Sequence, residues 1–258
     1  DTIGALLRLR GQRPVVATFH GWTNWQPGSM RWRVYGTLDR LALSRLDRVI
    51  YDSHRMIADS LGRVAQAPHL RFVPNGINID AFAGAAGRAL CASGPPTFLQ
   101  ISRFHPNKGQ LDLVRAAAQL AEQGRDDLRF VLVGDAAPDY ADYEAEVRGF
   151  VSEKDLTNVE FLGAVPHSAL CGIVAEADVL VAPSEVDGVS LAVLEAMSAG
   201  RAVICYAAAG FADSFTNDET AVILEKGNAG SLSQAMLSLA DDPARAQRIG
   251  AAASAFVR

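Results

Sequence analysis

Short apolar runs alternate with helical patterns along most of the chain. In the second part, apolar runs predict strands, and amphipathic stretches between them predict helices. The predicted strands cover residues 97–102, 128–133, 159–162, 179–181, 202–205 and 221–224, and the predicted helices cover 109–122, 139–151, 168–177, 191–199, 229–240 and 242–256. Strands separated by helices indicate right-handed βαβ units, so this part is predicted to be a parallel α/β domain.

The first part shows the same alternation with fewer strands. Strands are predicted at 14–19, 48–51 and 71–73, and helices at 29–44 and 53–65, after a helix tail at 1–13. Three strands are few for a doubly wound domain. We therefore expect an incomplete first Rossmann-like domain, as in a fragment of a longer enzyme or a truncated relative.

The domain boundary is predicted from composition. Residues 84–96 are rich in Gly, Ala and Pro and carry no period, which indicates a linker. The resulting division is a partial domain at 1–83, a complete domain at 97–240, and a final helix at 241–258 that is expected to be truncated.

Charge and cysteine content narrow the classes of function. The net charge of −5 conceals an imbalance, since residues 1–73 carry 11 Lys and Arg against 5 Asp and Glu. The basic section fits an anionic surface, with chance composition as the alternative, and no nucleic-acid recognition motif accompanies it. The three cysteines have no paired or metal-ligand spacing, and no apolar run could span a bilayer, which fits a reducing cytoplasm.

One stretch, residues 182–200, concentrates polar chemistry between two apolar runs. It reads A-P-S-E-V-D-G-V-S-L-A-V-L-E-A-M-S-A-G, a polar loop that enters a helix. In parallel α/β sheets, ligands bind where such a loop meets the helix start, because free N–H groups there attract anions and hydroxyl oxygens. Asp187 and Glu195 are expected to line one pocket wall, whereas Glu185 is expected to be a solvated loop charge.

A second loop, after the strand at 97–102, carries two cations. Arg103 and Lys108 flank the sequence R-F-H-P-N-K-G, which leads into a helix. Such a pair suits a diphosphate. Taken alone, however, these two residues are explained equally well as members of surface ion pairs. His54, His69, His105 and His167 lack ligand spacing and are expected at the surface.

The ordered strings of this chain resemble the family-four retaining glycosyltransferases of the GT-B fold. The matching strings are V-V-A-T-F-H-G, D-R-V-I-Y-D-S, V-P-N-G-I-N-I-D-A-F, I-S-R-F-H-P-N-K-G, F-V-L-V-G-D, V-E-F-L-G-A-V-P, A-D-V-L-V-A-P-S and D-G-V-S-L-A-V-L-E-A-M-S-A-G-R-A-V-I. Each string alone is weak, but the set is specific and covers nearly the whole chain.

The resemblance implies roles for individual residues. Arg103 and Lys108 match the pair that binds the donor diphosphate, and Glu195 matches the second acid of the E-x7-E motif, which holds the ribose. Asp187 stands at the first acid, which contacts the donor sugar, and His20 matches a histidine at the cleft rim. The implied catalytic residues are therefore His20, Arg103, Lys108, Asp187 and Glu195, and the donor-binding residues also include Gly134, Val165, Gly188, Val189, Ser190 and Leu191.

The chain departs from the family pattern in this motif. The first acid is usually Glu, and Asp187 is one methylene shorter, which puts donor-sugar recognition in question. Val189 and Ser190 replace the usual phenylalanine and second glycine, both modest changes in loop shape.

The resemblance also implies the reaction and its partners. The family transfers a sugar from a nucleoside-diphosphate sugar, here of UDP or GDP type, to a glycan or lipid-linked acceptor, with retention and without a required metal or other cofactor. A lipid-linked acceptor would place the protein at the inner face of the membrane, where Arg31 and Arg33 could meet anionic lipid. The alternatives are a non-catalytic or partner-dependent binding fragment and, less favoured, a nucleotide-sugar epimerase of the same fold.

Overall fold

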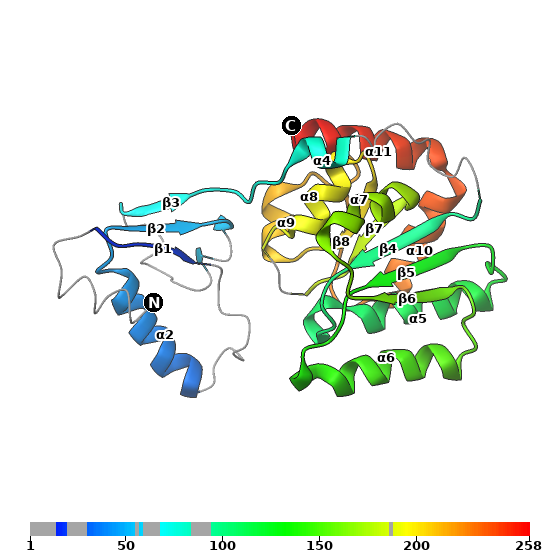
Figure 1. Cartoon of the computed structure of the whole chain (residues 1–258), viewed down its shortest axis with the longest axis horizontal. Helices are drawn as coiled ribbons and strands as arrows, with labels where there is room; N and C mark the ends of the chain where they lie inside the picture. The colour runs from blue at the N-terminus through cyan, green and yellow to red at the C-terminus, as the bar shows by residue number, and fades with distance from the viewer. Residues whose placement is uncertain (1–13, 20–29, 55–56, 59–67, 84–93, 186–187) are drawn as a thin grey trace. The chain divides into compact units, whose positions relative to one another are not determined.

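The chain divides into two compact units in the computed structural model, Asp1–Asn75 and Gly76–Arg258 (Figure 1). The structure describes residues 14–19, 30–54, 57–58, 68–83, 94–185 and 188–258. The second unit begins earlier in the chain than predicted and includes residues 76–83, which the sequence had assigned to the first domain. The predicted helix at 1–13, most of that at 53–65 and most of the predicted linker lie outside the described residues.

The first unit is built on a three-stranded parallel sheet in the order β1-β2-β3. Its strands are β1 (Val16–Phe19), β2 (Arg48–Tyr51) and β3 (Leu70–Phe72), and helix α2 (Met30–Leu43) connects the first two. A small core gathers apolar side chains from these elements, namely Phe19, Leu43, Leu46, Val49, Ile57 and Leu70. Several apolar side chains of α2 remain exposed, among them Met30, Val34, Leu38 and Leu41.

The second unit is built on a six-stranded parallel sheet in the order β6-β5-β4-β7-β8-β9. The strands are β4 (Thr97–Ile101), β5 (Arg129–Val133), β6 (Val159–Gly163), β7 (Val179–Ala182), β8 (Ala202–Tyr206) and β9 (Val222–Leu224). The inner strand β8 is buried at every residue, whereas the edge strand β6 alternates between more and less exposed positions. Burial on both faces explains why the inner strands read as continuous apolar runs.

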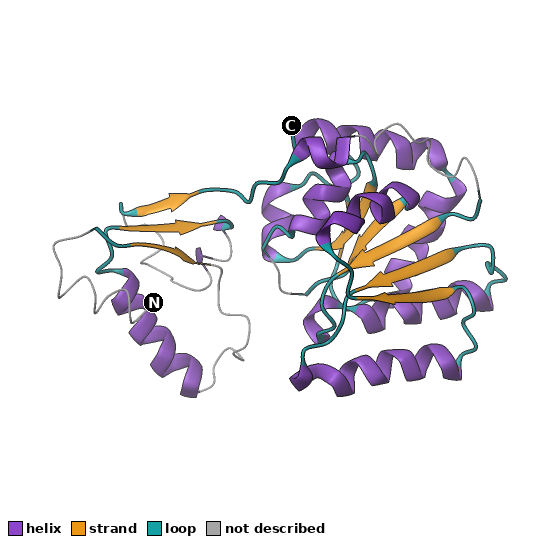
Figure 2. Cartoon of the chain, in the orientation of Figure 1, coloured by secondary structure: helices purple, strands orange, loops and turns teal. Residues whose placement is uncertain are grey.

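Helices cover both faces of this sheet (Figure 2). They are α4 (Ile79–Ala83), α5 (Gln110–Glu122), α6 (Ala141–Glu153), α7 (His167–Glu176), α8 (Leu191–Ser198), α9 (Ala209–Ser214), α10 (Ala229–Asp241) and α11 (Pro243–Phe256), with the short 3-10 helices η3 (Pro106–Lys108) and η4 (Pro138–Tyr140). One core lies under α5, α6 and α10 and the other under α4, α7, α8 and α9, while α11 contributes to both. None of the helices in the described ranges has both the length and the apolarity to cross a membrane.

The strand order places a topological switch point between β4 and β7. From β4 the chain builds β5 and β6 on one side and then crosses over to β7, β8 and β9 on the other. At such a point the chain leaves the two central strands for helices on opposite faces of the sheet, here α5 and α8, and ligands bind at the carboxyl ends of those strands. The loops after β4 and β7 are the two that the sequence singled out.

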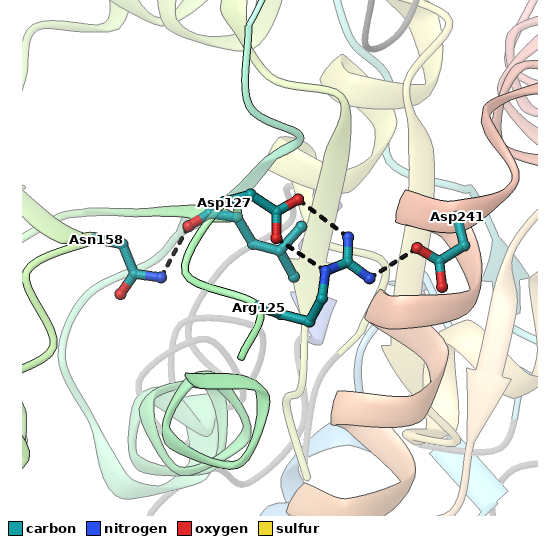
Figure 3. Close-up of polar contacts among 5 residues, drawn as sticks. Arg125, Asp127, Asn158 and Asp241 are labelled. Atoms are coloured by element: carbon teal, nitrogen blue, oxygen red, sulfur yellow. Dashed lines mark hydrogen bonds and ion pairs between the residues drawn. The ribbon is translucent and has the colours of Figure 1, made fainter. Parts of the chain in front are cut away.

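At the opposite end of the sheet, ion pairs and hydrogen bonds join the turns before β5 and β6 to α10 (Figure 3). Arg125, in the turn after α5, donates to both carboxylate oxygens of Asp127 at 2.8 and 3.1 Å and to Asp241 at 2.7 Å. The hydrogen bonds from Arg125 lower the pKa of Asp127. The hydrogen bonds to Asp127, and to a smaller extent that to Asp241, raise the pKa of Arg125. The Asn158 amide donates to the Leu128 carbonyl at 2.8 Å, so the turn before β5 is tied to both α10 and the turn before β6.

Candidate functional site

The loops that follow β4 and β7 interlock through their backbones. Asn107 accepts a hydrogen bond from the Glu185 amide at 2.9 Å. Gly109 has φ of 70°, and a Cβ placed on it would lie 2.2 Å from the Pro183 carbonyl oxygen. A side chain at position 109 would therefore push the loops apart, so the glycine of the N-K-G sequence is required by both conformation and space.

Two buried glutamines hold the loop that carries the cations. The Gln110 amide donates to the Arg103 carbonyl and to the Ser102 hydroxyl, both at 2.9 Å, and the Gln100 amide donates to the Lys108 carbonyl at 2.7 Å. Gln100 is 3% exposed and Gln110 is 1% exposed. The buried amides of Gln100 and Gln110 thus hold the main chain at both cationic residues.

A pocket brings Lys108 together with the start of α8. It is lined by Lys108, Ser184, Ser190 and Ala192, with Gln100 among the deeper residues. Ser190 precedes α8, and its side chain makes no capping hydrogen bond. The Val193 N–H donates to the Ser190 carbonyl at 3.1 Å, and among the described residues no side chain caps the N–H groups of Leu191 and Ala192. These N–H groups and the helix dipole favour an anion beside the Lys108 ammonium.

Glu195 lies one turn further along α8. It follows the pocket-lining Ala192 by three residues, so the two share a face of the helix. Glu195 is 5% exposed, and its Oε1 accepts a hydrogen bond from Nε2 of His167, the first residue of α7, at 2.8 Å. A buried carboxylate one helical turn from this pocket is suited to accept hydroxyl groups of a ligand whose phosphate lies at the helix start.

The other predicted donor-binding positions that the structure describes lie around these loops. Gly134 has φ of 129°, and a Cβ there would lie 2.1 Å from the Ser102 carbonyl oxygen, which brings the ends of β4 and β5 into close contact. A Cβ on Gly210 of α9 would lie 2.3 Å from the Gly188 carbonyl carbon. Val165 is half-buried against the core under α8, Val189 is buried and Leu191 is exposed.

Two predicted site residues, His20 and Asp187, lie outside the described residues. The roles assigned to them remain predictions. Glu185 is exposed, as the sequence led us to expect, and its amide takes part in joining the two loops.

The electrostatic effect of the two cations is visible at His105. Burial, Lys108 and Arg103, in that order, lower the pKa of this imidazole. Its Nδ1 accepts a hydrogen bond from the Asn107 amide at 3.1 Å, an arrangement that requires this nitrogen to be unprotonated. The neutral ring therefore caps η3 and leaves Arg103 and Lys108 as the charged groups of the loop.

Sequence reasoning missed three side chains that shape this site. Gln100 and Gln110 were passed over because amides within an apolar strand and a helix carry no motif. His167 was expected at the surface, and it is exposed, but its contact with Glu195 joins residues 28 positions apart and leaves no periodic signal.

Comparison with known proteins agrees with this geometry. The family model described as Glycosyl transferases group 1 matches residues 88–256, and the one described as Glycosyltransferase Family 4 matches residues 2–81. A curated relative, the GDP-mannose-dependent monoacylated alpha-(1-6)-phosphatidylinositol monomannoside mannosyltransferase of Corynebacterium glutamicum, is 27% identical over 96% of this chain. The chain spans 66% of the length of that relative.

Solved structures show the same fold. Sucrose-phosphate synthase from Thermosynechococcus elongatus superimposes with a TM-score of 0.85 and 27% identity, over 99% of this chain and 65% of that one. Anabaena HepE, solved in complex with UDP and glucose, superimposes with a TM-score of 0.81 and 22% identity, over 99% of this chain and 69% of that one. The predicted GT-B architecture of two Rossmann-like parallel sheets is confirmed. Since the first family model alone spans more than half of the sequence, the chain belongs to the Glycosyl transferases group 1 family.

Proposed function

We propose that this protein transfers a sugar from a nucleoside-diphosphate sugar to a glycan or lipid-linked acceptor, with retention of anomeric configuration. The observation that carries the proposal is the pocket shared by Lys108 and the start of α8, one turn from the buried carboxylate of Glu195. A nucleoside diphosphate offers the matching groups, because its phosphates are anionic and its ribose carries vicinal hydroxyls.

In the proposed step, the bond from the anomeric carbon to the diphosphate oxygen breaks and a bond to the acceptor oxygen forms on the same face. The acceptor proton passes to an oxygen of the departing phosphate. Lys108, Arg103 and the α8 N-terminus offset the negative charge that grows on that phosphate, and these groups are already in place before the reaction. Glu195 holds the ribose so that the diphosphate meets them.

The donor is proposed to be of UDP or GDP type. The Corynebacterium relative is named as GDP-mannose-dependent, so GDP-mannose is the first donor to test. The cations and the helix dipole supply the charge compensation that a metal would otherwise give, and we propose that no cofactor takes part. Binding of GDP or UDP should therefore stay within about twofold after EDTA treatment, as measured by calorimetry. A loss of affinity that Mg²⁺ or Mn²⁺ restores would contradict this.

The acceptor side is proposed to meet an anionic membrane. Helix α2 carries exposed apolar residues, and Arg33 is also exposed on it. Amphipathic basic helices bind membranes that contain anionic lipids. Vesicles of phosphatidylcholine with phosphatidylserine should retain the wild-type chain, and Arg31→Glu with Arg33→Glu should abolish retention. Equal retention of both proteins, or of neither, would end this part of the proposal.

Calorimetry against GDP, UDP and their sugars tests the donor site. Lys108→Ala and Glu195→Ala should each weaken nucleotide binding by about tenfold or more, because each removes a charged partner. Lys154→Ala serves as the matched control, since this exposed lysine follows α6 and lies outside both site loops. The site assignment fails if the wild-type chain binds none of these ligands or if the two variants bind as it does.

Product analysis separates transfer from the alternatives. The same binding data would be given by a non-catalytic nucleotide-sugar-binding protein, so the reaction needs its own measurement. Release of GDP or UDP together with a glycosylated acceptor supports transfer. A changed sugar without acceptor indicates an epimerase, and tight binding without products indicates a binding protein.

A further inference from the structure

His167 connects the buried carboxylate of Glu195 to a packed aromatic side chain. Its Nε2 donates to Glu195 Oε1 at 2.8 Å, and its ring lies edge-on to Phe82, with centroids 6.2 Å apart and planes at 77°. The histidine comes from α7, the carboxylate from α8 and the phenylalanine from α4. Residues from three helices, of which α4 is distant in sequence from the other two, thus meet at His167.

The burial of the two polar partners is very unequal. The His167 side chain is 72% exposed, whereas that of Glu195 is 6% exposed. Among the described residues, no other side chain donates to the Glu195 carboxylate. A buried carboxylate is costly to leave without hydrogen bonds, and it is free to rotate unless a donor fixes it. His167 meets both needs while the body of its ring stays at the surface.

Phe82, the aromatic side chain against which His167 packs, is itself held in place. Phe82 is 2% exposed, and α4 is tied to α7 by a hydrogen bond from the Cys171 thiol to the Ala81 carbonyl at 3.0 Å. A second bond, from the Ser198 hydroxyl to the Ile79 carbonyl at 3.3 Å, ties α4 to α8. The exposed imidazole therefore rests on an anchored aromatic side chain, which restricts the directions in which it can donate.

We propose that His167 is a positioning residue for Glu195, which it orients to receive the vicinal hydroxyls of a ribose. An ionised carboxylate has about four lone-pair positions, so one bond from His167 to Oε1 leaves enough acceptors for two hydroxyl groups. With Oε1 held, Oε2 keeps a constant direction in the site. This inference rests on the proposed function, because it assigns to Glu195 the ribose of a nucleoside diphosphate.

The alternative is that His167 occupies the ribose position and must leave when the ligand binds. The two readings predict opposite results. Removal of a positioning residue weakens binding of the ribose form, whereas removal of an occluding residue strengthens it.

The test compares GDP with 2′-deoxy-GDP, and UDP with 2′-deoxy-UDP, by calorimetry on the full chain. The wild type should prefer the ribose form by about tenfold. His167→Ala should weaken binding of the ribose form by about threefold to tenfold and change that of the deoxy form by less than about twofold, so that discrimination collapses. Changes of Kd in the ribose form alone point to orientation of Glu195 rather than to a general loss of structure.

Side chains of different reach sharpen the result. His167→Gln places an amide donor at nearly the same distance and should restore discrimination, whereas the shorter His167→Asn should not. Ser168→Ala is the matched control, since Ser168 is the next exposed residue of α7. Thermal melts of each variant confirm that the fold is retained, which the exposure of His167 favours.

The outcomes separate this inference from the proposed function. If nucleotide binding depends on Lys108 and Glu195 but His167→Ala matches the wild type or binds more tightly, the positioning role is wrong and the donor site stands. If His167→Asn restores discrimination as well as His167→Gln does, reach is irrelevant and the inference also fails. If the wild-type chain binds neither GDP nor UDP, the positioning role of His167 and the proposed function are both wrong.

Discussion

His105 couples the stability of the cationic loop to pH. Burial and the adjacent Lys108 and Arg103 lower its pKa in the folded chain, whereas the unfolded chain has the ordinary value of 6.5. Below pH about 6.5 the folded state therefore binds fewer protons than the unfolded state, and the stability present above that pH is progressively lost as the pH falls.

We therefore expect the wild type to lose more thermal stability between pH 7 and about 5 than His105→Asn, whose side chain can still accept from the Asn107 amide. Thermal melts in matched ionic strength measure the difference. The other histidines remain in both proteins, so their titration cancels in the comparison. Parallel pH profiles for the two proteins would contradict the effect assigned to His105.

Gln110 offers a second test at the level of a single side chain. Gln110→Leu keeps much of the volume but removes the hydrogen bonds to the Arg103 carbonyl and the Ser102 hydroxyl. We expect a loss of about 1–3 kcal/mol in the free energy of unfolding, because two polar groups lose a buried donor. Chemical denaturation measures it, with Gln123→Leu as the exposed control, expected within about 0.5 kcal/mol of the wild type. Equal losses of unfolding free energy for the two substitutions would show that the hydrogen bonds of the buried Gln110 amide do not stabilise the fold.

Two helical glycines differ in what surrounds them. In α9, a Cβ on Gly210 would lie 2.3 Å from the Gly188 carbonyl carbon, whereas in α7 a Cβ on Gly172 would meet nothing within 4 Å. Gly210→Ala should therefore destabilise the chain by about 1–3 kcal/mol and weaken nucleotide binding, because the loop before α8 must move. Gly172→Ala should be neutral or stabilise by up to about 1 kcal/mol through helix propensity. Denaturation curves of both variants decide this, and equal stabilities would contradict the close approach.

The regular elements followed from the sequence because their patterns are local. The predicted strand at 48–51 is confirmed as β2, and most other described strands and helices differ from the prediction by one or two residues at their ends. The short helices α4 and α9 were missed, since five or six residues are too few to establish a helical period.

The site was predictable in part. The loops with Lys108 and Glu195 carry motifs, and the strand alternation predicts that such loops meet at the carboxyl edge of a parallel sheet. The contact of His167 with Glu195 depends on how α7 packs beside α8, and the support from Gln100 depends on the exact path of the loop after β4. Neither the packing of α7 beside α8 nor the path of this loop can be predicted from the spacing of residues along the chain.

The described residues of the proposed donor site all lie within one unit. Residues 76–258 contain the complete six-stranded sheet, both of its cores and the described site residues Arg103, Lys108 and Glu195. We expect a fragment of residues 76–258 to fold cooperatively and to bind the same nucleoside diphosphate with a Kd within about threefold of that of the full chain. Calorimetry and thermal melts test this. A fragment that folds but has lost nucleotide affinity would show that residues before Gly76 contribute to the donor site.

The interlocking of the loops after β4 and β7 has a consequence for protein engineering. Gly109 fits directly against the Pro183 carbonyl, and the Asn107 carbonyl accepts the Glu185 amide, so the main chains of the two segments share one surface. A graft that transplants either segment alone from a homologue would introduce a mismatch across that surface. Attempts to exchange sugar-nucleotide preference among such enzymes should therefore treat the two segments as a single cassette and move them together.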